Sequence, residues 1–205
     1  MEDLAEVQAM LDATGISRAK EIVVSDKTVL NTALEEITFP LVMKVVGPVH
    51  KSDIGGVSLN VKDEIHVLRE FERMMKIKDT TAVLIQPMLK GVELFVGAKK
   101  DDNFGHMVLC GLGGIFVEIL KDISAGLVPI CKNESGEMIQ SLNSYNIIKG
   151  ARGQEGVNEK LFAEVIVRVS TLLKIAPEII EMDLNPLLGR QDSVIAVDAR
   201  IRVEV

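Results

Sequence analysis

The sequence contains no tryptophan, one tyrosine and only 3% aromatic residues. Proteins that bind nucleic acid by base stacking need aromatic side chains, so this scarcity argues against such a role. The charge argues the same way, because 23 basic and 30 acidic residues leave a net charge of −7 at pH 7. A nucleic-acid-binding surface would require the opposite sign. The composition therefore excludes nucleic acid as the expected partner.

Long apolar runs and paired cysteines are also missing. No run approaches the about 20 apolar residues that span a membrane, and the acidic residues after Met1 do not resemble a signal peptide. The two cysteines, Cys110 and Cys131, lie far apart and show no CxxC spacing. We therefore expect free thiols in a reducing, cytoplasmic environment and no membrane segment.

The 205 residues suffice for one substantial core, divided into two lobes over 1–85 and 86–205. Helical periodicity predicts helices over 2–14, 27–36, 63–76, 134–148 and 159–174. Apolar, β-branched runs predict strands over 22–24, 41–46, 57–61, 82–88, 93–99, 106–110, 115–120, 179–188 and 194–203. Strict alternation of strand and helix is absent, so the pattern favours an α+β fold over a doubly wound parallel sheet.

The most informative stretch is FPLVMKVVGPVHKSDIGGV, residues 39–57. Lys44 lies inside an apolar strand, where a cation is costly unless an anion meets it. The strand is followed by His50, Lys51 and Ser52 and then by the glycine pair Gly55 and Gly56. Paired glycines let backbone N–H groups approach a phosphate. A glycine pair alone often marks only a tight hairpin, but with Lys44 and its polar neighbours it predicts a phosphate site.

Oxygen-bearing side chains collect near the end of the chain. Glu181, Asp183 and Asn185 alternate and therefore share one face of a strand. Asp198 lies in a second apolar strand, where an unpaired carboxylate is costly. Mg²⁺ bound to nucleotide phosphates takes such oxygen ligands, so Asn185 and Asp198 are candidate metal ligands. The alternative is a buried Asp198 that pairs with Arg200.

Two further stretches are candidates for contacts with a nucleotide. In QPMLKGVELFVG, residues 86–97, backbone groups of Gln86, Pro87 and Met88 could contact an adenine edge, and Glu93 could accept from a ribose hydroxyl. A plain β-hairpin would give the same pattern. In GLGGIFVEILKD, residues 111–122, glycines and an inward glutamate could close over phosphates. The candidate residues there are Gly113, Gly114 and Glu118. Neither a Rossmann nor a P-loop pattern is present.

His50 is the candidate phosphate acceptor among the three histidines. It stands beside Lys51 and the glycines, whereas His66 falls on a predicted helix and His106 opens a strand. A lone histidine is usually structural or solvent-exposed, but beside a nucleotide it can carry a phosphoryl group. No zinc-site or Ser-His-Asp spacing is found in the sequence.

Taken together, these stretches resemble the ATP-grasp domain of the ADP-forming acyl-CoA synthetases, over residues 4–202. The matching segments are FPLVMKVVGPVHKSDIGGV, GVELFVGAKKDDNFG, GLGGIFVEILKDIS, KGARG and EMDLNPLL with AVDARI. The succinyl-CoA synthetase β chain is similar at a greater distance. The resemblance implies two lobes that hold ATP or ADP with Mg²⁺ between them.

The resemblance also implies an activity, in which acid, CoA and ATP give acyl-CoA, ADP and phosphate through a phosphohistidine. It places the family's lysine on Lys44, its glycine loop on Gly55 and Gly56, its metal ligands on Asn185 and Asp198, and a relay histidine on His50. A CoA-binding domain and a domain with the main catalytic histidine do not fit in 205 residues. We therefore expect a partner subunit in a hetero-oligomer, or a fused chain.

One departure from the family concerns a cation. The family usually has an arginine two residues after Ser124, where this chain has Gly126, so a phosphate-facing cation is expected to be missing. Two other functions stay open at this point. The chain could be a nucleotide-sensing domain of a larger protein, such as a fused acetyltransferase, or a scaffold that binds no nucleotide.

Overall fold

The structure is a computed structural model that describes residues 4–48, 54–114, 121–151, 153 and 155–204. The chain divides into two compact units. Unit 1 comprises residues 1–18 and 90–205, and unit 2 comprises residues 19–89. Each unit has its own sheet and its own hydrophobic core. The functional lobes expected over 1–85 and 86–205 stay a prediction.

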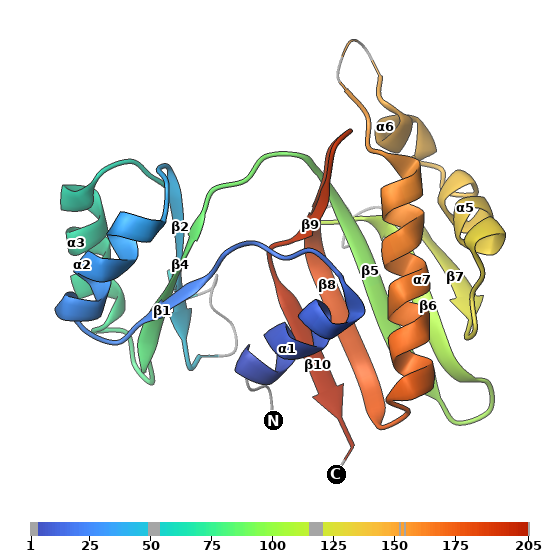
Figure 1. Ribbon diagram of the computed structural model, residues 1–205, viewed down its shortest axis with the longest axis horizontal. Coiled ribbons are helices and arrows are strands. Elements are labelled where there is room, and N and C mark those ends of the chain that lie inside the picture. The colour runs from blue at the N-terminus through green and yellow to red at the C-terminus, as the bar shows by residue number, and fades with distance from the viewer. Residues whose placement is uncertain (1–3, 49–53, 115–120, 152, 154, 205) are drawn as a thin grey trace. The chain divides into compact units, whose positions relative to one another are not determined.

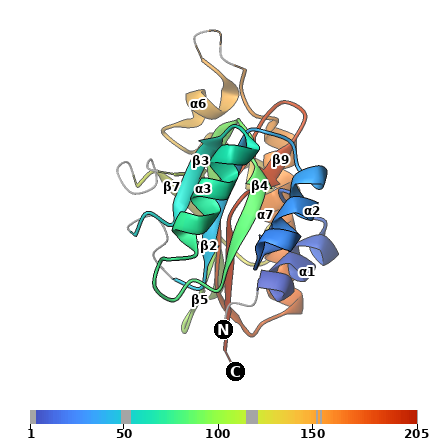
Figure 2. The same cartoon turned by 90° about the vertical axis from the view of Figure 1, so that its left-hand side faces the viewer.

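Unit 2 is an antiparallel sheet with its helices on one face (Figures 1 and 2). Its elements are β1 (Ile22–Val24), α2 (Lys27–Glu36), β2 (Leu41–Val46), β3 (Val57–Val61), α3 (Glu64–Met74) and β4 (Ala82–Pro87). The strand order is β1-β4-β2-β3. Both helices begin at an aspartate, because Asp26 and Asp63 accept hydrogen bonds from the first free amides. The predicted elements of this unit are therefore present.

The core of unit 2 lies between this sheet and α2 and α3. Met43 and Val45 of β2 and Ile85 of β4 point into it and are fully buried. Since side chains alternate along a strand, Lys44 and Gln86 point to the opposite face. The face of the sheet that carries Lys44 is thus separate from the helix-side core.

The buried face of α3 is not the one that its apolar spacing suggests first. Ile65, Leu68 and Phe71 have helical spacing in the sequence, but Ile65 is 73% exposed and Leu68 is also exposed. Val67, Phe71 and Met74 are buried instead. Both sets of residues have helical spacing, and Phe71 belongs to both. The apolar pattern alone therefore could not show which set is buried.

Unit 1 is a larger antiparallel sheet, with α1, α5 and α7 packed on one face (Figure 1). Its elements are α1 (Leu4–Thr14), β5 (Val92–Asp101), β6 (Gly105–Leu112), β7 (Ile123–Leu127), α5 (Lys132–Gln140), α6 (Tyr145–Lys149), α7 (Glu159–Ile175), β8 (Ile179–Gly189), β9 (Val194–Ala196) and β10 (Ala199–Val203). The strand order is β10-β8-β5-β6-β7, and β9 pairs with β8. Apolar residues of β5, β6 and β8 face the helices and form the core.

Three elements of unit 1 depart from the prediction. The helix predicted over 134–148 is two helices, because the Asp122 carboxylate accepts hydrogen bonds from the amides of Asn143 and Ser144. The strand predicted over 194–203 is interrupted at Val197 and Asp198. Strand β7 was not predicted, and the strand predicted over 115–120 lies outside the described residues.

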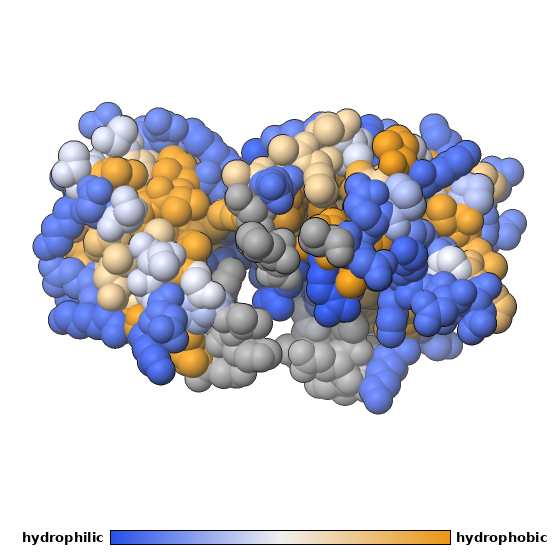
Figure 3. Space-filling model, turned by 90° about the horizontal axis from the view of Figure 1, so that it is seen from below, coloured by the Kyte–Doolittle hydropathy of each residue, from blue (hydrophilic) through white to orange (hydrophobic). Residues whose placement is uncertain are grey.

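Separate helices and antiparallel strand ladders confirm the α+β prediction. Within the described residues, no helix has the length and apolar character needed to cross a membrane. The face drawn in Figure 3 carries mostly hydrophilic residues around smaller apolar areas. Cys110 and Cys131 are both free thiols, as expected.

Candidate functional site

In unit 1 the predicted site residues lie on the face of the sheet that the helices leave open. Leu184 of β8 and Leu94 of β5 point into the helix-side core and are fully buried. Their neighbours Asn185 and Glu93 therefore point to the open face. The register also places Asp183 on this face, opposite Gly97 of β5 and Arg200 of β10.

Hydrogen bonds join the second glycine stretch to the predicted metal ligand. The Gly114 amide donates to Asn185 Oδ1 over 3.0 Å, and the Gly113 amide donates to the Glu93 carbonyl over 2.8 Å. Gly114 has a φ of +61°, and its missing side chain leaves the space that the Glu93 carboxylate occupies. Glycine is therefore required at 114 both by the positive φ and by the space that Glu93 takes. These contacts join Glu93, Gly113, Gly114 and Asn185 into one cluster.

Asp183 lies on the same face but is not among the predicted metal ligands. Its Oδ1 atom is buried and has no hydrogen-bond partner in the structure. Burial raises the pKa of the Asp183 carboxyl, and Arg200 opposes this rise while Asp198 and Glu181 add to it. The alternation of Asp183 with Asn185 was the available signal, since it placed both residues on one face.

The side-chain oxygen atoms on this face are suitable ligands for a hard divalent cation. Asn185 and Asp198 are both half-buried and offer an amide and a carboxylate oxygen. Among the described residues no cluster of three His, Cys, Asp or Glu side chains could hold a metal by itself. Mg²⁺ needs no such cage, because it commonly binds one or two protein oxygens together with nucleotide phosphates. Asp183 adds an unpartnered buried oxygen to the same face.

Unit 2 carries Lys44, Gly55, Gly56, Gln86, Pro87 and Met88. Lys44 is half-buried on the face opposite the helices, and Gln86, on the same face, is only 3% exposed. The carbonyl of Gly55 accepts from Arg73, and that of Gly56 accepts from the Val45 amide. These bonds fix the glycine pair through its carbonyl groups.

The backbone of 86–88 offers fewer donors than the sequence suggests. Pro87 has no N–H group, and the Met88 amide donates to the Pro40 carbonyl over 2.8 Å. Contact of this segment with an adenine edge stays a prediction, and neither Pro87 nor Met88 has a free N–H group for it. The predicted residues His50, Lys51, Ser52 and Glu118 lie outside the described residues.

Position 126, where the family has an arginine, lies on β7, and a side chain there would not point to the open face. A side chain built at Gly126 would point at Ile130 and Met138, which belong to the core on the helix side. Gly126 also pairs with Val108, which is buried in the same core. A Cβ at 126 therefore points away from the face that carries Asn185, and the expectation that a phosphate-facing cation is missing there stays a prediction.

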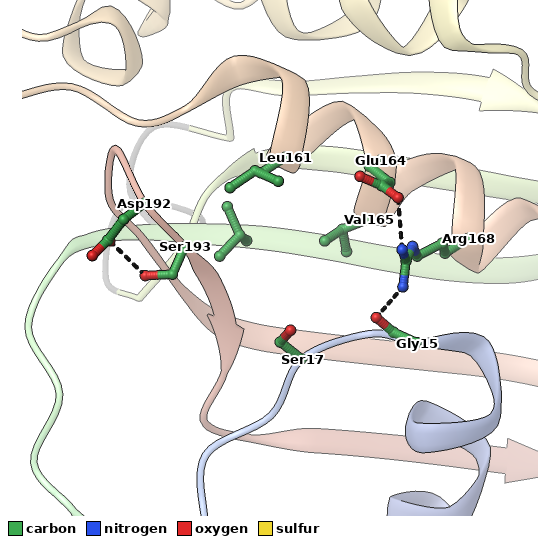
Figure 4. A pocket seen from close by; sticks show the side chains of 9 residues that line it. Gly15, Ser17, Leu161, Glu164, Val165, Arg168, Asp192 and Ser193 are labelled. Atoms are coloured by element: carbon green, nitrogen blue, oxygen red, sulfur yellow. Dashed lines mark hydrogen bonds and ion pairs between the residues drawn. The ribbon is translucent and has the colours of Figure 1, made fainter.

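Two cavities of unit 1 contain none of the predicted site residues. One, of about 160 Å³, lies between the end of α1, α7 and the turn after β8 (Figure 4). Its Arg168 is held by Glu164 and by the Gly15 carbonyl, so it caps α1. The other, of about 420 Å³, is lined by Lys90 and Arg190 with several glycines. Neither cavity supports the predicted chemistry.

Comparison with known proteins gives consistent similarities. The model of the ATP-grasp domain family matches residues 2–203. The β subunit of ADP-forming acetate–CoA ligase I from Pyrococcus furiosus is 45% identical over 176 residues, which cover 81% of this chain and 76% of that protein. ADP-forming acetate–CoA ligase II from Archaeoglobus fulgidus is 39% identical over 201 residues, or 97% of this chain and 30% of that protein.

Solved structures show similarity to the same group of proteins. Acetyl-coenzyme A synthetase 1 from Candidatus Korarchaeum cryptofilum, in complex with coenzyme A and Ca-AMPCP, superposes with a TM-score of 0.92 at 31% identity. The match covers 99% of this chain and 92% of that chain. A second structure of that protein, with coenzyme A and Mg-AMPPCP, has a TM-score of 0.86 at 32% identity and covers 100% and 92%. This chain thus covers 76% of the β subunit and 92% of the solved chains, but only about a third of ligase II from Archaeoglobus fulgidus.

Proposed function

The chain belongs to the ATP-grasp domain family of the ADP-forming acetate–CoA ligases, and on this premise we propose that it binds ATP or ADP with Mg²⁺ for such a ligase. The reaction is acid + CoA + ATP = acyl-CoA + ADP + phosphate. The observation that carries the proposal is the hydrogen bond from Gly114 to Asn185, which joins a glycine turn to a candidate metal ligand. The relatives reported above are ligases, so a purely sensory role is not favoured.

The proposed roles are assigned within each unit separately. In unit 2 the Lys44 ammonium neutralises phosphate charge, with backbone amides at Gly55 and Gly56 beside it. In unit 1 Asn185 and Asp198 would hold Mg²⁺, and Glu93 accepts from a ribose hydroxyl. Bound Mg²⁺ supplies neutralisation of the charge on the phosphates.

Phosphoryl transfer then requires a nucleophile. We assign this role to His50 or to a histidine of the partner. An imidazole nitrogen attacks the γ-phosphorus, the bond from phosphorus to the bridging oxygen breaks, and ADP leaves. The CoA-binding and catalytic domains belong to a partner subunit or to a fused chain, since one relative is a β subunit and another is about three times as long.

Calorimetric titration of Mg-ADP into the chain tests nucleotide binding. We expect Lys44→Met and Asn185→Ala each to weaken affinity about tenfold or more, because each removes an interaction with a charged group. Lys62→Met and Asn133→Ala, at exposed positions, serve as controls and should bind as the wild type does. Chelation of Mg²⁺ should weaken the wild type and leave Asn185→Ala nearly unchanged. Equal binding by all variants would refute the assignment.

Transfer of labelled phosphate from ATP, with the partner present, tests His50. His50→Ala should lose the label on this chain, whereas His66→Ala, on α3, should keep it. Unchanged labelling in His50→Ala would remove this histidine from the mechanism while leaving nucleotide binding intact.

A further inference from the structure

The side chain of Arg73, in the last turn of α3, links that helix to the glycine pair of unit 2. Its Nη1 group donates to the Gly55 carbonyl over 2.8 Å, although 18 residues separate the two in the chain. On its other side, Nε and Nη2 both donate to Oε2 of Glu70, over 3.1 and 2.8 Å. Because a guanidinium group is planar and rigid, the carboxylate fixes the plane in which Nη1 reaches the glycine.

Glu70 is well placed to hold this guanidinium group. Its side chain is 14% exposed, whereas that of Arg73 is 43% exposed. The hydrogen bond from Arg73 lowers the pKa of the Glu70 carboxyl, burial opposes this change, and a hydrogen bond with Ser58 of β3 adds to it. Glu70 is therefore ionised at neutral pH, and it ties α3 to the strand that follows the glycines.

Gly55 has a backbone conformation that few residues other than glycine adopt. Its φ is +68°, and glycine has more conformational freedom than any other residue. A Cβ built at this position would lie 3.6 Å from Nη1 of Arg73, an ordinary contact, so the positive φ and not a lack of space requires glycine. The Gly56 carbonyl accepts from the Val45 amide over 2.8 Å. Both carbonyl groups of the pair are thus bonded to the body of unit 2.

The bond to Arg73 leaves the N–H group of Gly55 for a ligand. Gly55 is exposed, and within the described part of the chain no group accepts a hydrogen bond from its N–H. Because Arg73 fixes the carbonyl, the φ of +68° sets the direction of this N–H group. The charge of the guanidinium is paired with that of Glu70, so Arg73 is suited to hold the glycine pair and not to bind phosphate itself.

We propose that Arg73 is a positioning residue for phosphate binding, which holds Gly55 so that its N–H group meets a phosphate oxygen of the nucleotide. This inference rests on the proposed nucleotide-binding function and adds a residue that does not touch the nucleotide. Without the bond from Arg73, the nucleotide itself would have to order the glycine. Fixing the backbone of one residue in this way lowers the affinity about tenfold.

Calorimetric titration of Mg-ADP into three variants tests the proposal. Arg73→Met removes the donors and keeps an apolar stem, so it should bind Mg-ADP about tenfold more weakly than the wild type. Arg73→Lys keeps the charge and one donor for the Gly55 carbonyl, so its affinity should stay within about threefold of the wild type. Arg69→Met, at an exposed position of the same helix, makes the same change of charge and should bind as the wild type does.

Backbone amide resonances in NMR spectra separate positioning from a loss of folding. On addition of Mg-ADP, the Gly55 N–H resonance should shift in the wild type and in Arg73→Lys, and much less in Arg73→Met. The resonance of Gly105, at the start of β6 in unit 1, should have the same position in all variants if they are folded. Glu70→Gln keeps Arg73 and weakens its support, so it is a milder variant that should bind Mg-ADP about threefold more weakly.

Three results would overturn the proposal while nucleotide binding stands. They are an unchanged affinity for Mg-ADP in Arg73→Met, an equal loss of affinity in Arg69→Met, and a Gly55 resonance that does not respond to Mg-ADP in the wild type. A wild-type chain that binds no Mg-ADP would instead remove the proposed function, and this inference with it.

Discussion

The amide of Gly114 donates to the side-chain oxygen of Asn185 over 3.0 Å, although 71 residues separate them in the chain. The bond orients the Asn185 amide, and the second lone pair of its oxygen stays available to a cation. Beside it, the Glu93 carboxylate occupies the space that a side chain at 114 would need. Two residues of the candidate site, Asn185 and Glu93, therefore depend on one glycine.

Replacement of Gly114 by alanine should destabilise the chain and weaken Mg-ADP binding. The new methyl group would collide with the Glu93 carboxylate, and a non-glycine residue at positive φ costs about 1 kcal/mol by itself. We expect a loss in the free energy of unfolding of about 2–4 kcal/mol, which denaturant titration would measure.

Gly105→Ala is the matched control for this substitution. Gly105 has a φ of +74° and no atom within 4 Å of the added methyl group, so it should lose only the about 1 kcal/mol of backbone strain. In a Glu93→Ala background, Gly114→Ala should cost no more than Gly105→Ala does. A cost for Gly114→Ala equal to that of Gly105→Ala in the wild type would show that Glu93 does not occupy this space.

Ser170 should contribute to the stability of unit 1 through a single bond. Its hydroxyl oxygen accepts from the Ile130 amide over 2.8 Å, and both residues are buried. Ser170→Ala leaves that amide without a partner, so we expect a loss in the free energy of unfolding of about 1–3 kcal/mol. Thr171→Ala, one residue along α7 and exposed, should change it by less than about 0.5 kcal/mol. Similar losses in the two variants would contradict this account.

Local signals in the sequence were sufficient for most of the fold. Apolar runs located the strands that carry Lys44 and Asn185, and helical periodicity located α2 and α3. Alternation along β8 also placed Asp183 and Asn185 on one face, as the structure confirms. These features depend on residues close together in the sequence, which is why sequence patterns predict them.

Features that depend on distant residues could not be predicted in this way. Asp122 interrupts a helix 21 residues further along by bonding the Asn143 amide. The Pro40 carbonyl takes up the Met88 amide, which leaves that segment without the donor expected from its sequence. Whether position 126 faced the site or the core depended on its pairing with Val108, which the sequence does not reveal.

Cys110 should make stability depend on pH in the alkaline range. The thiol is fully buried in unit 1, and burial raises its pKa from 9.0 to about 12. Above pH 9 the unfolded chain loses this proton while the folded chain keeps it, so the unfolded state is favoured. The contribution of the protonated Cys110 thiol to the free energy of unfolding is fully present below pH 9. It is lost between pH 9 and 12, by about 1.4 kcal/mol per pH unit.

Unfolding midpoints between pH 8 and 10.5 would measure this effect. Cys110→Ala lacks the group and should show a weaker fall than the wild type, after its own loss of packing is subtracted at pH 8. Cys131, which is exposed, should react with a thiol reagent in the folded chain, whereas Cys110 should react only after unfolding. Parallel pH profiles for the wild type and Cys110→Ala would show that this thiol does not cause the fall.

Restoring the family arginine at position 126 should not improve nucleotide binding. Its side chain would leave the sheet toward Ile130 and Met138, on the side of the helices. We therefore expect Gly126→Arg to bind Mg-ADP within about twofold of the wild type, as titration calorimetry would show. Ala125→Arg places the same cation one residue away on the opposite face, since Ala125 pairs with Leu109, which lies between the core residues Val108 and Cys110. If Gly126→Arg tightened binding tenfold while Ala125→Arg did not, the assignment of faces in β7 would be reversed.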